Sequence, residues 1–223
     1  GISVVGGHTE ITHGLSRPIL LGTMIGEVEK HKLITPRGAN PGDRILLTKG
    51  VPIEATAILA REFPDRLANR LKPSEIEEAQ NFLKTPGISV YKDAQLAIKA
   101  GRVSAMHDPT EGGLAAALWE LAEASGKKLI VDLTKVFIPS ISTQVCKIFD
   151  IDPYAAISSG ALLMTTPPDE MDRICSALMK DGIICREIGW VDSGPVSVED
   201  SKGTSTNTLK RPERDEIAKV YEA

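Results

Sequence analysis

The sequence has few of the features that would assign it to a nucleic-acid-binding, membrane or disulfide-rich class. Aspartate and glutamate outnumber lysine and arginine, 30 to 26, so no basic excess points to nucleic acid as a partner. No apolar run approaches the roughly 20 residues that a membrane helix needs, so no membrane association is expected. The 3 cysteines are odd in number and lack the paired spacing of a zinc site. We therefore expect free thiols, a cytoplasmic location and a small-molecule substrate.

The composition is that of an ordinary folded chain. Of 223 residues, 42% are hydrophobic and 25% are charged, which is enough to bury a core as one large domain or two small ones. The chain starts with Gly1 instead of Met, inside an apolar segment that resembles a strand and lacks the features of a secretory signal. We therefore expect a piece of a longer protein.

Alternating strand and helix patterns run along the chain. Strands are predicted over 2–5, 19–28, 44–48, 103–106, 128–131, 160–165, 183–184, 188–191 and 196–198. Helices are predicted over 52–63, 74–82, 92–100, 114–124, 140–149, 169–180 and 213–222. The late strands follow one another too closely for parallel crossovers. The predicted fold class is therefore α/β (α+β), with a mixed, largely antiparallel sheet and helices packed on one face.

One segment is suited to chemistry: Met106-His107-Asp108-Pro109-Thr110-Glu111-Gly112-Gly113-Leu114. It lies between a predicted strand and a predicted helix, and helix N-termini carry free N–H groups and partial positive charge that can hold phosphate. Asp108 is a candidate Mg²⁺ ligand, since hard cations prefer carboxylate oxygen. Thr110 is a candidate phosphate donor, and Gly112 and Gly113 allow a ligand to approach the backbone closely.

The same residues also have a purely structural interpretation. Asp108 or Thr110 caps the helix, Pro109 lies in its first turn, and the glycines permit close packing. The segment matches neither the Walker phosphate loop nor the dinucleotide fingerprint. Lys49 is a second candidate phosphate contact, although a solvated lysine at a strand end is the commoner case. The residues alone therefore leave a ligand site and a capped helix as alternatives.

A resemblance to a known superfamily favours the ligand site. The segment is similar to the D-x-T-x-G-G segment of the hydrogenase maturation factor HypE. More distantly it resembles selenophosphate synthetase and thiamine-monophosphate kinase, which belong with aminoimidazole ribonucleotide (AIR) synthetase, or PurM, among ATP-using enzymes. Gly6-Gly7-His8-Thr9-Glu10 resembles the glycine-rich end of the family's ATP-binding domain, which implies nucleotide contacts for Gly6, Gly7 and Thr9. Residues 41–48, 121–126, 160–165 and 189–191 resemble successive segments of the second domain.

The resemblance implies an organisation and an activity. Residues 1–14 would be a remnant of the N-terminal ATP-binding domain, 15–200 an AIR synthetase-like C-terminal domain and 201–223 a polar tail. The full-length protein would be a HypE-like, ATP-dependent enzyme with Mg²⁺, forming a homodimer and activating or phosphorylating a small substrate. The piece alone is expected to be inactive.

Two departures from the HypE pattern bear on this function. Glu111 stands where HypE commonly has arginine, and an acid there repels phosphate. HypE also ends in a tail whose cysteine carries the reacting group, whereas no cysteine follows Cys185 here. The alternative function is therefore a nucleotide-binding regulatory or assembly module without turnover.

Overall fold

The computed structural model describes residues 2–202 and 205–222 and divides into two units, Gly1–Leu33 and Ile34–Ala223. Among its described residues, the first unit contains a short 3-10 helix, η1 (Lys30–Lys32), and no strand. Its apolar side chains are exposed, as Val5 and Leu20 show at 97% each. The strands predicted over 2–5 and 19–28 are therefore not formed, because neither segment has a neighbouring strand to satisfy its backbone N–H and C=O groups.

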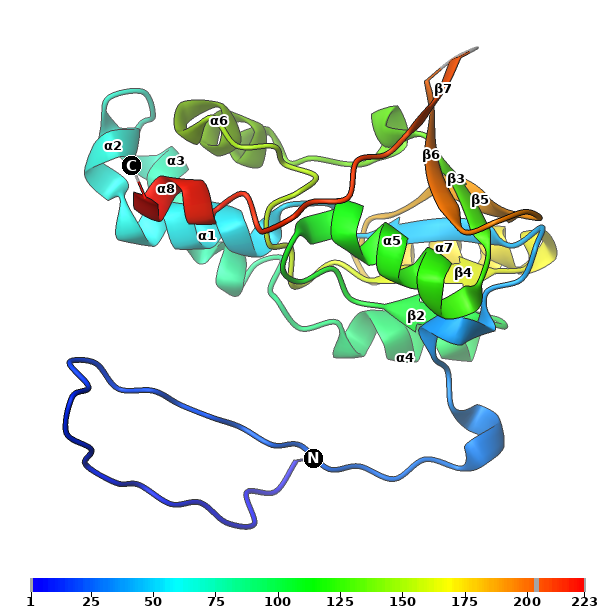
Figure 1. Ribbon diagram of the computed structural model, residues 1–223, viewed down its shortest axis with the longest axis horizontal. Helices are drawn as coiled ribbons and strands as arrows, with labels where there is room; N and C mark the ends of the chain where they lie inside the picture. The colour runs from blue at the N-terminus through cyan, green and yellow to red at the C-terminus, as the bar shows by residue number, and fades with distance from the viewer. Residues whose placement is uncertain (1, 203–204, 223) are drawn as a thin grey trace. The chain divides into compact units, whose positions relative to one another are not determined.

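The second unit is built on a seven-stranded sheet of order β2-β4-β1-β5-β3-β6-β7 (Figure 1). The strands are β1 (Arg44–Thr48), β2 (Ala105–His107), β3 (Lys128–Val131), β4 (Leu163–Thr166), β5 (Cys185–Asp192), β6 (Ser197–Lys202) and β7 (Ser205–Thr208). Among these strands, β3 and β6 pair in parallel and the other neighbours pair antiparallel. The predicted mixed, largely antiparallel sheet is confirmed.

Helices connect the strands close to the predicted positions. They are α1 (Ile53–Glu62), α2 (Pro64–Ala68), α3 (Pro73–Gln80), α4 (Tyr91–Ala100), α5 (Gly113–Ser125), α6 (Ser140–Phe149), α7 (Pro168–Lys180) and α8 (Ala218–Glu222), with 3-10 turns η2 (Pro36–Gly38), η3 (Asn81–Leu83) and η4 (Leu133–Lys135). In the described part of the chain, no helix combines the length and apolar character needed to cross a bilayer. The helix predicted from residue 74 begins one residue earlier: α3 starts at Pro73, whose fixed φ suits a first helical turn, and the Glu75 carboxylate accepts from the Lys72 backbone N–H at 2.8 Å.

Helices cover both faces of the sheet, which corrects the expectation of one covered face. Ile45 and Leu47 of β1 belong to the core formed with α5, whereas Leu46 belongs to the core formed with Ala97 of α4 and Leu178 of α7. Successive side chains of a strand point to opposite faces, so the apolar run in β1 is buried on both sides.

A third core joins helices at one end of the sheet. Figure 1 shows α1, α2, α3, α6 and α8 grouped beyond the strands. Phe63 and Phe149 belong to this core, and their ring centroids lie 5.7 Å apart. Val220 of α8 is buried there, and the Tyr221 ring meets Phe63 edge-on at 5.4 Å. The C-terminal helix α8 therefore packs against helices from the first half of the second unit.

Candidate functional site

The motif segment forms a turn between a strand and a helix, as predicted. β2 ends at His107 and α5 begins at Gly113. Asp108 is exposed and Thr110 is half-buried. The His107 Nε2 lies 2.6 Å from the Glu120 Oε2 on α5, so this histidine has a structural partner. The turn thus holds Asp108 at the surface beside the start of α5.

The two glycines of the turn meet strict conformational and steric demands. Gly112 and Gly113 have φ of 74° and 60°, in the left-handed region that favours glycine. A Cβ on Gly113 would lie 2.5 Å from the Ala156 carbonyl oxygen and 2.7 Å from that of Tyr154. A Cβ on Gly112 would lie 2.7 Å from the Ala116 Cβ. Packing within the protein is therefore sufficient to require both glycines.

The start of α5 is capped by groups distant in sequence. Its N-cap residue, Gly112, offers no side chain, and neither Asp108 nor Thr110 caps the helix through its side chain. The Gly112 N–H donates to the Asp215 Oδ2 at 2.6 Å, and the Ala115 N–H donates to the Tyr154 carbonyl at 2.8 Å. The Gly113 N–H donates to the Thr110 carbonyl at 2.9 Å. The helix start thus already holds one carboxylate, and helix capping does not explain Asp108.

Asp108 is suited to a metal ion only in combination with other oxygens. Within the described ranges it forms no ion pair. Those ranges also contain no group of three His, Cys, Asp or Glu side chains that could hold a metal. Mg²⁺ commonly binds one or two carboxylates and completes its shell with phosphate oxygens and water. The free carboxylate of Asp108 fits this kind of shared site and not an all-protein one.

The other candidate nucleotide contacts belong to the first unit. Gly6 and Gly7 are exposed, and a Cβ on either would meet nothing within 4 Å. Thr9 is exposed as well. Packing therefore gives no reason for this double glycine, in contrast to Gly112 and Gly113. The assignment of Gly6, Gly7 and Thr9 to a nucleotide stays a prediction.

Lys49 has a structural role that neither sequence interpretation anticipated. Its Nζ lies 3.0 Å from the Asp93 Oδ2 and donates to the Ser89 carbonyl at 2.7 Å. Asp93 is fully buried, and its Oδ1 accepts from the Thr48 hydroxyl at 2.7 Å. No short-range spacing could reveal this pair, because Asp93 comes from α4. Lys49 is thus neither solvated nor available to a phosphate.

The cysteines are free thiols in the structure. Cys146 is buried, and burial together with the nearby Asp152 charge raises its thiol pKa to about 12. The Cys175 and Cys185 sulfurs lie 3.5 Å apart, a proximity that sequence did not predict. Their contact lowers the pKa of Cys175, whereas the same contact and burial raise the pKa of Cys185. Cys146 therefore stays protonated and unreactive at neutral pH.

Comparison with known proteins identifies several relatives. The profile described as "AIR synthase related protein, C-terminal domain" matches residues 40–201. A Methanocaldococcus jannaschii protein named for hydrogenase expression/formation is 26% identical over 182 residues, covering 81% of this chain and 50% of the relative. Carbamoyl dehydratase HypE of Cupriavidus necator is 26% identical over 184 residues, covering 80% of this chain and 48% of the relative. The chain thus spans about half the length of these curated relatives.

A solved structure shares the fold. Hydrogenase maturation protein HypE in complex with ATP superposes with a TM-score of 0.64 at 20% identity, covering 86% of this chain and 57% of that one. The matched profile segment, 40–201, contains the whole motif turn. The turn is therefore part of the shared domain.

Proposed function

Because the chain belongs to the AIR synthase related family through its C-terminal domain, we propose that it is part of an ATP-dependent enzyme that activates or phosphorylates a small substrate. The observation that carries this proposal is Asp108, an exposed carboxylate that neither caps α5 nor pairs with a cation in the described part of the chain. The ATP complex of the structurally similar HypE supports a nucleotide as the ligand.

Each residue of the turn has a role in this proposal. Asp108 would hold Mg²⁺, which when bound neutralises charge that develops on the phosphates. Thr110 would donate its hydroxyl to a phosphate oxygen, and Gly112 and Gly113 would allow that phosphate to approach the backbone. A phosphate that takes the Gly112 N–H must displace the Asp215 carboxylate, which now accepts from it at 2.6 Å. Nucleotide binding would therefore release this contact of the C-terminal segment.

Amide chemical shifts test the proposal, since they detect weak binding and locate it. We expect Mg²⁺-ATP to shift the amides of Gly112, Gly113 and Leu114 in the isotope-labelled chain. Asp108→Asn should abolish the effect of Mg²⁺ on ATP affinity, because the amide keeps the shape and loses the charge that a hard cation requires. Asp169→Asn is the matched control, since Asp169 is an exposed acid on α7. Equal Mg²⁺ dependence in the two variants would rule out Asp108 as the metal ligand.

A nucleotide-binding regulatory or assembly module is the second candidate, and the Asp215 contact favours it. A carboxylate already seated on the helix start is suited to being exchanged for a phosphate without any chemistry. Phosphate release from ATP by the full-length protein separates the two functions. Release that depends on Asp108 supports the enzyme, whereas saturable binding without release supports the module. We also infer a homodimer, which sedimentation equilibrium of the full-length protein checks.

A further inference from the structure

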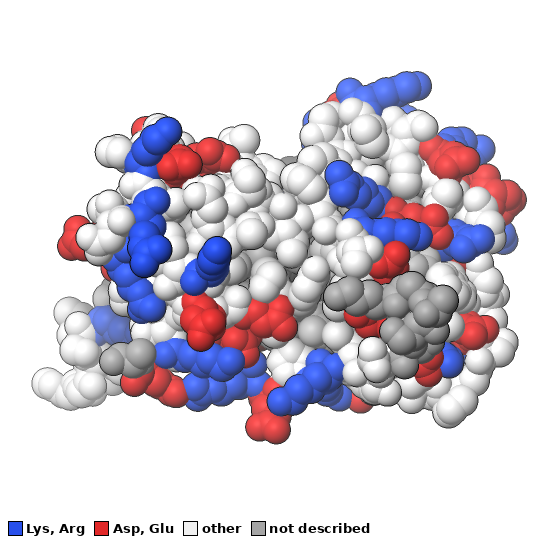
Figure 2. All heavy atoms as spheres, turned by 90° about the horizontal axis from the view of Figure 1, so that it is seen from above, with Lys and Arg blue, Asp and Glu red and all other residues white. Residues whose placement is uncertain are grey.

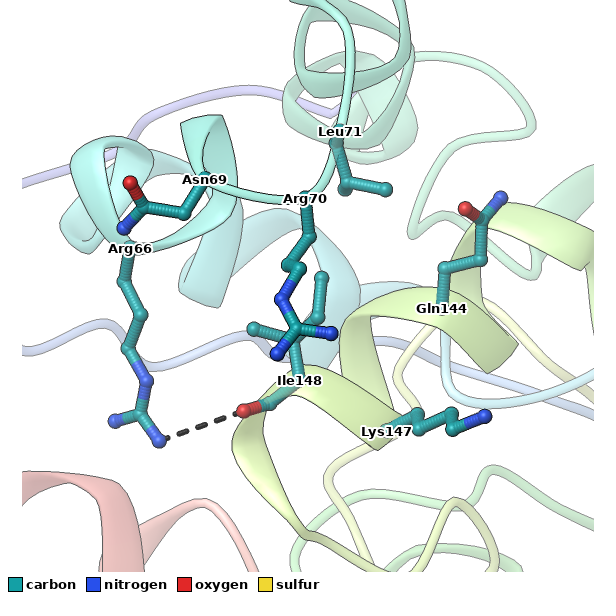
Figure 3. Close-up of a pocket in the computed structure, with 7 residues that line it drawn as sticks. All are labelled: Arg66, Asn69, Arg70, Leu71, Gln144, Lys147 and Ile148. Carbon is teal, nitrogen blue, oxygen red and sulfur yellow. Dashed lines mark hydrogen bonds between the residues drawn. The ribbon is translucent and has the colours of Figure 1, made fainter.

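A basic pocket lies between α2 and α6, away from the motif turn (Figure 3). Its cavity measures about 640 Å³. It is lined by Arg66, Asn69, Arg70 and Leu71 from α2 and the residues after it, and by Gln144, Lys147 and Ile148 of α6. Three of these side chains are cationic and none is acidic. In a protein of net charge −4, such a local excess of positive charge needs an explanation.

No acidic side chain among the described residues pairs with these three cations. Within residues 2–202 and 205–222, none of Arg66, Arg70 and Lys147 forms an ion pair. Like charges that share one cavity repel one another, and the repulsion is relieved when an anion binds. Figure 3 shows Arg66 and Arg70 extending toward Ile148, with Lys147 on the neighbouring helix.

Arg66 has a structural role that the other two cations lack. Its Nη2 donates to the Ile148 carbonyl at 3.4 Å, and its guanidinium carbon lies 4.5 Å from the centre of the Phe149 ring. These contacts fix the guanidinium before any ligand arrives, which lowers the entropy cost of binding. Among the side-chain hydrogen bonds and cation–π contacts of the described residues, none involves Arg70 or Lys147, so capping and stacking do not account for them.

We propose that this pocket binds a phosphorylated small molecule of about mononucleotide size. Guanidinium groups match the oxygens of a phosphoryl group in pairs, and Lys147 adds a point charge suited to a second negative group. Asn69 and Gln144 offer neutral hydrogen-bonding groups, and Leu71 and Ile148 offer apolar surface for the rest of the ligand. The cavity volume lies within the range typical of small-molecule sites.

The charge pattern distinguishes this ligand from a nucleic acid. A nucleic-acid surface needs a stripe of positive charge that follows the phosphate backbone. Figure 2 shows basic and acidic side chains interspersed over the face in view, without a field of one sign. The cations of the pocket are confined to Arg66, Arg70 and Lys147, a compact grouping that suits a compact anion.

Titration of the isotope-labelled chain with inorganic pyrophosphate tests the site. At an ionic strength of about 0.05 M, where screening is weak, we expect saturable shifts of the Arg70, Leu71 and Lys147 amides. The double variant Arg70→Gln/Lys147→Gln should weaken binding by about tenfold or more, which corresponds to about 1.4 kcal/mol. Both side chains are exposed, so the double variant should have the same melting temperature as the parent protein.

A charge-matched control makes the result decisive. Lys84→Gln/Lys135→Gln removes the same charge from two exposed lysines outside the pocket and should leave the affinity unchanged. The proposal is overturned by an absence of saturable shifts, by equal weakening in the control, or by tighter binding of a single-stranded oligonucleotide with shifts spreading beyond the pocket. The Gly112 and Gly113 amides report separately on the motif turn, so the two proposals fail independently.

Discussion

Replacing Gly113 with alanine tests whether packing dictates the glycines of the turn, and Gly126→Ala is its matched control. The two glycines stand at opposite ends of α5 with similar φ, 60° and 68°. A Cβ on Gly126 would meet nothing within 4 Å, whereas one on Gly113 would lie 2.5 Å from the Ala156 carbonyl oxygen. The substitutions therefore share the backbone strain and differ in the steric clash.

The difference in cost follows from these contacts. Left-handed strain costs alanine about 1–2 kcal/mol, and the smaller entropy of the unfolded chain offsets about 0.4–1 kcal/mol of it, so Gly126→Ala should cost about 1 kcal/mol. The clash at Gly113 adds about 1–3 kcal/mol of overpacking. Displacing the Tyr154 carbonyl from the Ala115 N–H adds about 0.5–1.5 kcal/mol. We expect Gly113→Ala to cost about 1.5–4.5 kcal/mol more than Gly126→Ala.

Urea unfolding followed by tryptophan fluorescence measures both variants. Trp119 of α5 is half-buried, and its Nε1 donates to the Leu209 carbonyl at 2.9 Å, so its emission reports on this helix. In a thermal melt of a chain of this size, each 1 kcal/mol shifts the melting temperature by about 2–4 °C, so the variants should differ by about 3–18 °C. Equal losses of unfolding free energy in the two variants would refute the reasoning. They would mean that the loop carrying Tyr154 and Ala156 moves to accommodate a Cβ at no measurable cost.

Three further predictions follow from buried or exposed groups. Asp93→Asn should lower the free energy of unfolding by about 3–5 kcal/mol, because Lys49 would stay buried without its counter-charge; a loss below about 1 kcal/mol in urea unfolding would contradict this. Folding raises the pKa of Cys146 from 9.0 to about 12, so its contribution to stability is present below pH 9 and is lost as pH rises toward 12. Cys146→Ala should flatten that alkaline decline in a pH series of urea midpoints, and an unchanged slope would assign the decline to other groups. Asp108→Asn should change the unfolding free energy by no more than about 0.5 kcal/mol, and a larger change in scanning calorimetry would show a structural role.

Local patterns predicted much of the fold. The apolar run at Ile45 predicted β1, the periodicity before Phe149 predicted α6, and the strand-to-helix context placed the turn around Asp108. These features depend on residues close together in the chain, where spacing alone carries the information. The family resemblance added the superfamily, which the profile match to residues 40–201 confirms.

Long-range contacts account for what sequence could not predict. The partner of Lys49 is Asp93 on α4, and the cap of Gly112 is Asp215 near the C-terminal helix. The two residues of each pair are far apart in the chain, so neither the helical nor the strand period relates them. Burial of β1 on both faces was also missed, since a short apolar run is equally consistent with one covered face. The nucleotide contacts of Gly6, Gly7 and Thr9 also depend on groups distant in the chain, so no local pattern identifies them. The assignment of these three residues stays a prediction.

The close approach of the 154–156 loop to Gly113 has an evolutionary consequence. Any descendant that keeps this loop must keep glycine at 113, whether or not it still binds a ligand, because a side chain would collide with the two carbonyls. Invariance of that glycine among relatives is therefore expected from packing, and is not by itself a sign of ligand binding. The fold does not require Asp108 in this way, since its side chain is exposed and does not cap α5. A relative that retains Gly113 but has lost Asp108 would be expected to keep the fold and to lack the proposed Mg²⁺-dependent activity.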